Sequence, residues 1–325
     1  MAEVERIAKG LYWDRALTLV SGCTPVSPGC DHCWGASEAH MRAGQTNEKI
    51  KAIYGGLTTP SGKWNGQVRV HPERLSIPLR RKVPTVYAVW MDLFHNKVPE
   101  AFIAAAFTAM SMATQHTFLI LTKRPERMRD YVLDTIERRV TWREGVTGRL
   151  PSNIWLGVTA ENQEQADKRI PVLLAIPAAV RFVSVEPMLG PVDLTSIQPD
   201  QYIRMDVLEG CGISSRSPAQ MIPNAFCKPL DWVIVGGETG PGARPVHPGW
   251  IRSLRDQCQA AGVPYFFKQW GEWVCPTVGG YDDLPMPPAR QSDRWHGKTG
   301  TIRVGKKAAG RLLDGVEHNE MPEVE

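Results

Sequence analysis

Asn153-Ile154-Trp155-Leu156-Gly157-Val158 is an apolar run of a kind that recurs along the chain and decides the fold. It is followed by the more polar Thr159–Asn162 and then by a helical pattern from Gln163 to Leu174. The run is nearly continuous rather than alternating, which is typical of parallel strands covered on both faces. The stretch therefore predicts one strand–helix unit of a parallel α/β sheet.

Runs of similar character occur at 16–20, 67–70, 85–91, 117–121, 180–185, 232–235 and 264–267. Helical patterns over 72–82, 99–113, 126–138 and 248–261 separate most of them. Eight such units within about 260 residues predict an α/β fold, either a (β/α)8 barrel or a partial TIM-like barrel. A doubly wound open sheet is the alternative.

The domain organisation follows from where this alternation stops. Residues 191–230 show no clear period and predict an insertion. We expect one barrel domain over residues 1–275 and a C-terminal appendage over 276–325 that packs on the barrel. Within the appendage, residues 301–304 predict a strand and 306–313 a short helix.

Composition bounds the class of protein. The chain has 325 residues, 42% of them hydrophobic, which is enough for a sizeable core, and its net charge is +4. That charge is compatible with an anionic partner but does not require one. No segment approaches the ~18 consecutive apolar residues of a membrane span. We therefore expect a soluble, cytoplasmic protein, monomeric and without a membrane partner.

The cysteines are unevenly distributed. Cys23, Cys30 and Cys33 fall within Gly22-Cys-Thr-Pro-Val-Ser-Pro-Gly-Cys-Asp-His-Cys33, spaced C-x6-C-x2-C. Three thiols projecting from one loop at a strand end can hold a single metal centre. An odd total of seven cysteines favours a reducing compartment over a disulfide framework.

Two further metal interpretations stay open. His32 or His40 could complete a Cys3His zinc site with the same loop, although the six-residue gap is long for zinc. An auxiliary cluster could use the scattered Cys211, Cys227, Cys258 and Cys275, for which ordinary burial is the simpler explanation.

Charged residues follow directly after the apolar runs, at the predicted strand ends where a parallel barrel has its active site. They are Asp92, Lys123, Glu161, Glu186, Glu238 and Lys268. From position alone we expect catalytic roles for Lys123, Glu186, Glu238 and Lys268. Cofactor binding is expected from Asp92, Lys123, Glu161 and Glu186. A single charge at a strand end can equally be a helix cap or a solvated loop residue.

Two basic stretches could meet a nucleic-acid backbone, or could be solvated helical faces. One starts at Lys123-Arg124 and the other is Arg80-Arg81-Lys82.

Taken together and in this order, the motifs resemble a known family. They are the cysteine loop, Asp92-Leu-Phe-His95, Leu121-Thr-Lys-Arg-Pro125, Leu156-Gly-Val-Thr159, Ser184-Val-Glu-Pro187, Trp232-Val-Ile-Val-Gly-Gly-Glu238, Phe267-Lys-Gln-Trp270 and Gly305–Gly315. The chain is similar to the bacteriophage and bacterial three-cysteine-motif family, a divergent branch of the radical S-adenosylmethionine superfamily. The similarity spans about Asp14 to Pro322.

This resemblance implies a radical-SAM-type barrel with a [4Fe-4S] cluster on Cys23, Cys30 and Cys33. Three ligands leave one iron open to S-adenosylmethionine, whose reductive cleavage gives a 5′-deoxyadenosyl radical that abstracts substrate hydrogen. A flavodoxin- or ferredoxin-like reductant is expected. The implied substrate is DNA or a nucleotide-linked group, such as a hypermodified thymidine in a phage, modified or rearranged by an isomerase or lyase type of reaction.

The sequence departs from the superfamily at two points. The usual spacing is C-x3-C-x2-C with an aromatic residue before the last cysteine, whereas here the first gap is six residues and His32 takes that place. The Gly-Gly-Glu segment follows the seventh predicted strand rather than the second. Two alternatives remain: a DNA photolesion lyase of the spore-photoproduct type, and a non-catalytic, zinc-stabilised nucleic-acid-binding or phage assembly protein.

Overall fold

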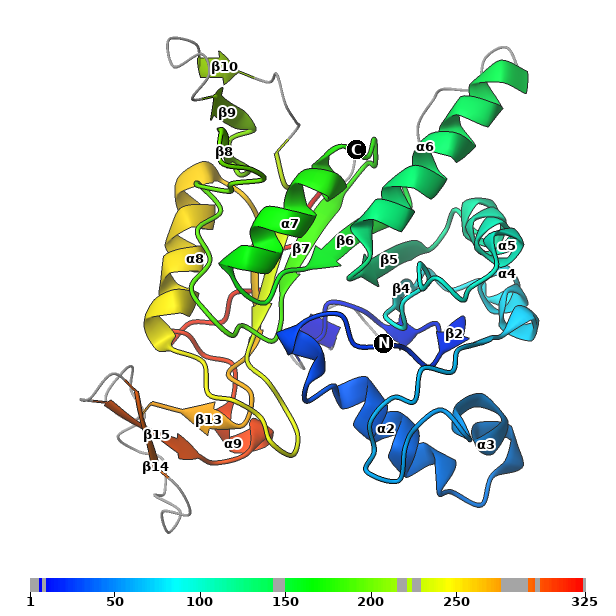
Figure 1. The fold of residues 1–325 in the computed structure, drawn as a ribbon, viewed down its shortest axis with the longest axis horizontal. Coiled ribbons are helices and arrows are strands. Elements are labelled where there is room, and N and C mark those ends of the chain that lie inside the picture. Colours follow the sequence, from blue (N-terminus) through cyan, green and yellow to red (C-terminus); the bar gives the residue numbers. More distant parts are fainter. Residues whose placement is uncertain are drawn as a thin grey trace.

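A parallel sheet of seven strands forms the centre of the protein in the computed structural model (Figure 1). The model describes residues 6–7, 10–142, 150–214, 221–223, 229–275, 292–295 and 299–323. In spatial order the strands are β1 (Arg15–Ala16), β4 (Val86–Val89), β5 (Thr117–Thr122), β6 (Ile154–Thr159), β7 (Arg181–Val185), β11 (Trp232–Gly236) and β12 (Tyr265–Gln269). All neighbours pair in parallel, and the sheet curls into a half-barrel.

Of the two barrel forms expected from the sequence, the partial barrel is confirmed and the count of eight strands is wrong within the described residues. The run 67–70 forms only β3 (Arg69–Val70), which pairs antiparallel with β2 (Val20–Ser21) outside the sheet. The run 16–20 is split, because the chain leaves the sheet after Ala16. A run of only four residues can form its backbone hydrogen bonds in a two-stranded ribbon as readily as in a barrel.

Segments near both chain ends lie along the open edges of the sheet. Asn319 forms an antiparallel bridge with Phe266 of β12, and the indole of Trp232 donates to the carbonyl of Glu320 at 2.8 Å. At the other edge, the backbone N–H of Asp14 donates to the carbonyl of Val86 at 2.8 Å. These contacts satisfy strand-edge groups that would otherwise be left unpaired.

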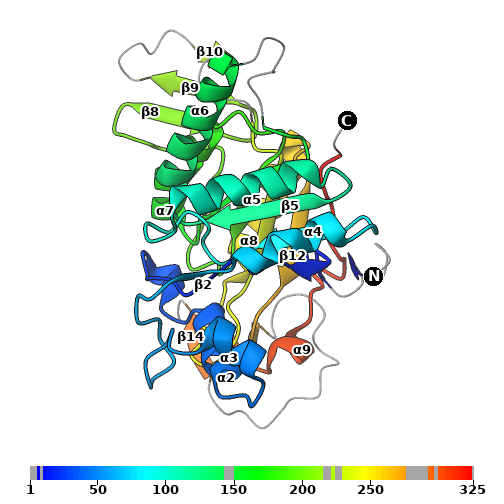
Figure 2. The same ribbon diagram turned by 90° about the vertical axis from the view of Figure 1, so that its right-hand side faces the viewer.

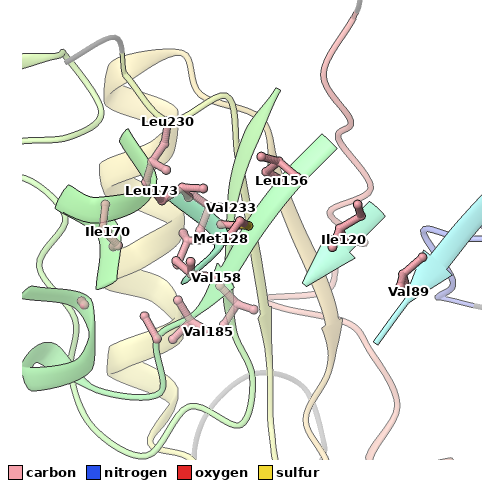
Figure 3. Close-up of a cluster of buried hydrophobic side chains, with 14 of the residues drawn as sticks. Val89, Ile120, Met128, Leu156, Val158, Ile170, Leu173, Val185, Leu230 and Val233 are labelled. Carbon is pink, nitrogen blue, oxygen red and sulfur yellow. The ribbon is translucent and has the colours of Figure 1, made fainter. Parts of the chain in front are cut away.

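Helices cover the outer face of the sheet: α5 (Glu100–Met112), α6 (Pro125–Trp142), α7 (Gln163–Leu174) and α8 (Pro248–Ala261). Figure 3 shows part of the resulting core, in which Ile120, Leu156 and Val185 of the strands and Met128 and Leu173 of the helices belong to one buried cluster. All five side chains are fully buried. Burial of each such side chain contributes roughly 1.5–3 kcal/mol.

The inner face has its own aromatic core, because side chains alternate along each strand. Trp155, Phe182, Trp232 and Phe266 pack there with Tyr12 from the N-terminal segment. Tyr12 contacts Trp232 edge-on, with ring centroids 5.4 Å apart. The amino-terminal half of the barrel interior is therefore filled, and the polar strand ends lie beyond it.

The remaining elements lie at the two ends of the molecule (Figures 1 and 2). The predicted insertion contains a three-stranded antiparallel sheet of β8 (Ile203–Asp206), β9 (Cys211–Ser214) and β10 (Met221–Pro223). At the opposite end lie α2 (Trp34–Ala43), α3 (Glu48–Tyr54) and a C-terminal sheet of β13 (Trp273–Val274), β14 (Ser292–Trp295) and β15 (Thr299–Arg303).

Two short helical segments differ from expectation. The predicted helix 72–82 is a 3-10 turn, η2 (Pro72–Arg74), followed by α4 (Ser76–Arg80). The predicted helix 306–313 is the single turn α9 (Lys306–Ala309), which stops because Gly310 takes a φ of +68°. No helix within the described ranges has the length and apolar character needed to cross a membrane.

Candidate functional site

The cysteine loop connects β2 to α2. Cys23 lies two residues after β2, Cys30 ends the 3-10 turn η1 (Pro28–Cys30), and Cys33 is the N-cap residue of α2. All three cysteines are free and half-buried. Because the main sheet is parallel, its strand ends gather at one edge, and side chains from that edge contact this loop.

The first contact comes from the ends of β4 and β5. Asp92 is buried and forms an ion pair with Arg124, while Thr122 Oγ1 donates to Asp92 Oδ1 at 2.6 Å. Arg124 Nη2 donates to the Thr24 carbonyl at 3.0 Å, and its Nη1 lies 3.8 Å from Cys23 Sγ. One guanidinium, oriented by a buried carboxylate, therefore fixes the start of the loop.

The electrostatics at Cys23 follow from this packing. Burial and the nearby Asp92 carboxylate raise the pKa of the Cys23 thiol to about 11, and Arg124 opposes that rise. The thiol is therefore protonated at neutral pH, and binding a metal would release its proton.

The second contact comes from the end of β6. Glu161 is fully buried, and its Oε1 accepts from the backbone N–H of Gly29 at 3.1 Å. Its Oε2 pairs with Arg169 Nη1 of α7 at 2.9 Å. Burial alone would raise the pKa of Glu161, but the Arg169 guanidinium, with a smaller effect of Lys123, lowers it. Glu161 is therefore an ionised anchor beneath the middle of the loop.

The third contact comes from the segment after β11. Glu238 is buried, and Arg244 binds both of its carboxylate oxygens, Nε to Oε2 at 2.8 Å and Nη2 to Oε1 at 2.6 Å. Arg244 also donates to the Pro28 carbonyl at 3.0 Å and lies 3.4 Å from Asp31. Glu238 thus orients an arginine that holds the loop between Cys23 and Cys33.

A separate pair lies on the inner face. Lys268 Nζ is 2.8 Å from Glu186 Oε1, and Gln269 Nε2 lies 3.4 Å from the same oxygen. Lys268 also lies over the Tyr12 ring, 5.9 Å from its centroid. Glu186 and Lys268 are both half-buried, so this ion pair has access to solvent.

The predicted site residues therefore fall into two groups. The first group contacts the cysteine loop, directly or through an arginine, and consists of Asp92, Glu161 and Glu238. Lys123 lies close enough to Glu161 to lower the pKa of that carboxylate. Glu186 and Lys268 form the second group. Position in sequence predicted both sets of carboxylates but not which group each joins.

Sequence reasoning missed the arginines that connect these carboxylates to the loop. Arg169 and Arg244 were not predicted, and Arg124 was considered only beside Lys123 at a strand end and as part of a basic stretch. The arginines could have been predicted from the sequence, because a buried carboxylate needs a cationic partner. Candidates within ten residues were Arg169 for Glu161 and Arg244 for Glu238.

The histidines flanking the cysteines have other neighbours. His40 Nδ1 is hydrogen-bonded to Thr58 Oγ1 at 3.0 Å. The His32 ring lies against Gly242, where a Cβ would come within 2.7 Å of Nδ1. In the ranges that the structure covers, no three His, Cys, Asp or Glu side chains converge in a geometry that could hold a metal ion.

The three scattered cysteines that the structure describes lie in different parts of the fold. Cys258 is buried in α8, where burial raises its pKa to about 12, and Cys275 is buried after β13. Cys211 is half-buried in β9, and Cys227 lies outside the described residues. Cys258 and Cys211 therefore have ordinary structural environments.

The cysteine loop offers three thiol donors for an iron–sulfur cluster, although in this structure they do not converge into a group that could hold a metal ion. Three free thiols belong to one eleven-residue segment, and side chains from the ends of the central strands hold its backbone. Cys33 is close enough to Cys23 to contribute slightly to the raised pKa of the Cys23 thiol. Cys23, Cys30 and Cys33 are thus the residues that would hold such a group, and three thiolates leave one coordination position for another ligand.

The fold and this site define a mixed α/β protein with a partial parallel barrel and a cysteine-rich candidate metal centre at its strand ends. A family model matches residues 9–322, and the chain belongs to that family, DUF5131, which is described as a protein of unknown function. Comparisons with curated proteins and with solved structures find no match.

Proposed function

We propose that the protein is a radical S-adenosylmethionine enzyme whose Cys23, Cys30 and Cys33 hold a [4Fe-4S] cluster. One observation carries the proposal. The only loop in the described chain with three free cysteines is also the loop to which three buried or half-buried ion pairs donate and accept hydrogen bonds. Holding a loop this firmly is typical of a preorganised metal site.

When bound, the cluster would supply the electron that cleaves S-adenosylmethionine to a radical able to abstract hydrogen. The chain's own residues would hold the cysteine loop in position and offset negative charge at its thiolates. Arg124 lies beside Cys23 Sγ and offsets negative charge there, while Asp92 fixes the guanidinium. Glu161 and Arg244 hold the loop backbone.

The second group would serve a bound small molecule. Lys268 and Glu186 offer a donor and an acceptor on the inner face, 2.8 Å apart and open to solvent. A carboxylate that accepts from an amine or hydroxyl, beside an ammonium that pairs with an anion, suits an amino-acid or nucleotide group. We assign Glu186 and Lys268 to cofactor or substrate binding, and Glu238 to positioning of the loop through Arg244.

For the substrate we propose a nucleic-acid-linked group, such as a hypermodified thymidine in phage DNA. The support is the net charge of +4 and the resemblance of the motif order. Repair of a DNA photolesion is the variant of this proposal. A base within duplex DNA would have to be flipped out of the stack to reach the barrel mouth.

The decisive test is anaerobic reconstitution with iron and sulfide. We expect about four irons per chain and a broad absorption near 400 nm, both lost in Cys30→Ala. Cys211→Ala is the matched control, because Cys211 is a free, half-buried cysteine far from the loop in sequence, and it should load normally. Formation of 5′-deoxyadenosine after reduction would then establish the cofactor.

Zinc is the competing outcome. Stoichiometric zinc in the purified protein, with no iron uptake on reconstitution, would exclude the radical enzyme and favour the zinc-stabilised binding protein. The DNA substrate is tested separately, by whether a duplex carrying the modified base raises 5′-deoxyadenosine formation above that with unmodified duplex.

A further inference from the structure

An open pocket of about 370 Å³ lies at the amino-terminal ends of the strands, away from the cysteine loop. Arg15 of β1 and Tyr87 of β4 line it and are register partners in the sheet. Each is at or near the start of its strand, whereas the cysteine loop contacts residues beyond the strand ends. The pocket is therefore separate from the candidate metal centre.

Four cationic side chains line this pocket: Arg15, Arg80, Arg81 and Lys82. Within the described part of the chain, none of the four forms an ion pair, although most other arginines of the structure do. Arg81 Nε donates only to Thr85 Oγ1, at 2.6 Å. Four like charges around one hollow repel each other unless an anion lies between them.

The end of α4 is fixed in place, so the cations are not on a loose tail. His116 Nε2 lies 3.0 Å from the carbonyls of both Pro78 and Arg81, and Gln115 Nε2 donates to the Arg81 carbonyl at 3.0 Å. These contacts hold the backbone that carries Arg80 to Lys82. A preorganised cluster of cations loses less entropy on binding an anion.

Tyr87 supplies an independent sign of a ligand. Its side chain is only 1% exposed, it lines the pocket, and its phenol oxygen has no hydrogen-bond partner among the residues that the structure describes. A buried hydroxyl without a partner is costly, so a phosphate oxygen that reached this hydroxyl from the pocket would stabilise the complex. Burial raises the pKa of Tyr87 despite nearby Arg81 and Arg15, so the hydroxyl stays protonated and can donate.

We propose that this pocket binds the phosphate of a nucleotide, either a free mononucleotide or one within a nucleic-acid backbone. Guanidinium and ammonium groups pair with phosphate oxygens, and the Tyr87 hydroxyl donates a further hydrogen bond. Ile77 and Val83 give the pocket an apolar wall that suits a sugar or base edge. This site does not depend on the radical chemistry proposed above.

The test uses the full-length protein and two probes, adenosine monophosphate by calorimetry and a labelled duplex of about 20 base pairs by anisotropy. Arg80→Ala with Lys82→Ala should weaken binding about tenfold, because two phosphate partners are removed. The matched control is Arg204→Ala with Lys49→Ala, which removes the same charges from exposed positions elsewhere and should change binding less than about twofold.

Tyr87→Phe provides a second variant that keeps the ring. It should weaken binding several-fold while leaving the melting temperature equal or higher, since the removed hydroxyl has no partner among the described residues. Saturable binding of the mononucleotide identifies a free nucleotide as ligand, and binding of the duplex alone identifies the backbone. The proposal is overturned if neither probe binds, or if the pocket variants and the control pair weaken binding equally. Iron loading should be unchanged in all of these variants, which separates this outcome from failure of the radical enzyme.

Discussion

The carboxylate of Glu161 accepts a hydrogen bond from the backbone N–H of Gly29 at 3.1 Å, although 132 residues separate the two in sequence. Glu161 has no exposed surface and is neutralised by Arg169. Glycine permits this close approach, because a Cβ at Gly29 would lie 3.0 Å from the carboxylate. The cysteine loop is therefore fitted to a carboxylate that follows β6, the middle strand of the sheet.

Replacement of Glu161 by alanine should destabilise the protein by about 3 kcal/mol, because it leaves the buried Arg169 charge without a partner. Chemical denaturation measures this change. The control is Glu164→Ala, which removes an exposed carboxylate from the adjacent helix start and should cost less than about 1 kcal/mol. Equal losses in the two variants would show that the buried pair contributes no more than a surface one.

Replacement of Arg124 by lysine should loosen the start of the cysteine loop. A single ammonium cannot bind Asp92 and both oxygens of Thr24 at once, so we expect a loss of about 1–2 kcal/mol. Alkylation of Cys23 in the metal-free protein, followed by mass spectrometry, should become faster. Arg129→Lys, at a more exposed arginine in the helix α6 that follows Arg124, is the control and should leave the alkylation rate unchanged.

The ion pairs of Asp314 should contribute to the stability of the fold in a pH-dependent way. Asp314 pairs with Arg252 at 2.5 Å and Arg255 at 2.6 Å, and hydrogen bonds from Arg252 are the main reason that its pKa falls to about 2. A lowered carboxylate pKa stabilises the fold above the unfolded value of ~3.9, and this stabilisation is lost as the pH falls toward 2.

The test variant for this pair is Asp314→Asn, because asparagine tolerates the φ of +54° found at this position. It should lower stability at pH 7 by about 1 kcal/mol, a modest figure because the side chain is 36% exposed. The difference from the natural protein should shrink at pH 3. A difference that stays constant between the two pH values would contradict the lowered pKa.

A side chain at Gly237, next to Glu238, should clash with the backbone. A Cβ at Gly237 would lie 1.9 Å from the backbone carbonyl oxygen of Trp270, which cannot move aside as a flexible side chain would. Gly237→Ala should therefore destabilise the protein by about 3 kcal/mol in thermal or chemical unfolding. Gly44→Ala is the control, since its Cβ would meet only the Met41 carbonyl oxygen at 3.5 Å, and its effect should stay within about 0.5 kcal/mol.

Local sequence patterns predicted the strands and helices that carry most of the core. The predicted strand at 153–158 is β6, shifted by one residue, and the helical pattern from Gln163 to Leu174 is α7 without a change of boundary. These elements are readable because strands buried on both faces need continuous apolar residues, and a helix start here has the capping residue Asn162. The prediction that residues 67–70 form a barrel strand was wrong, because a short run does not specify which strand it pairs with.

The sequence by itself determined the parallel α/β class, the order of the strands along the chain and the three clustered cysteines, since each follows from local residue types. Only the tertiary structure decided that the barrel is partial, that Arg244 connects Glu238 to Pro28, and that Glu186 pairs with Lys268. Apolar periodicity reports whether a residue is buried, which is a local property. The partner of a buried charge is set by the register and curvature of the whole sheet, which no local pattern records.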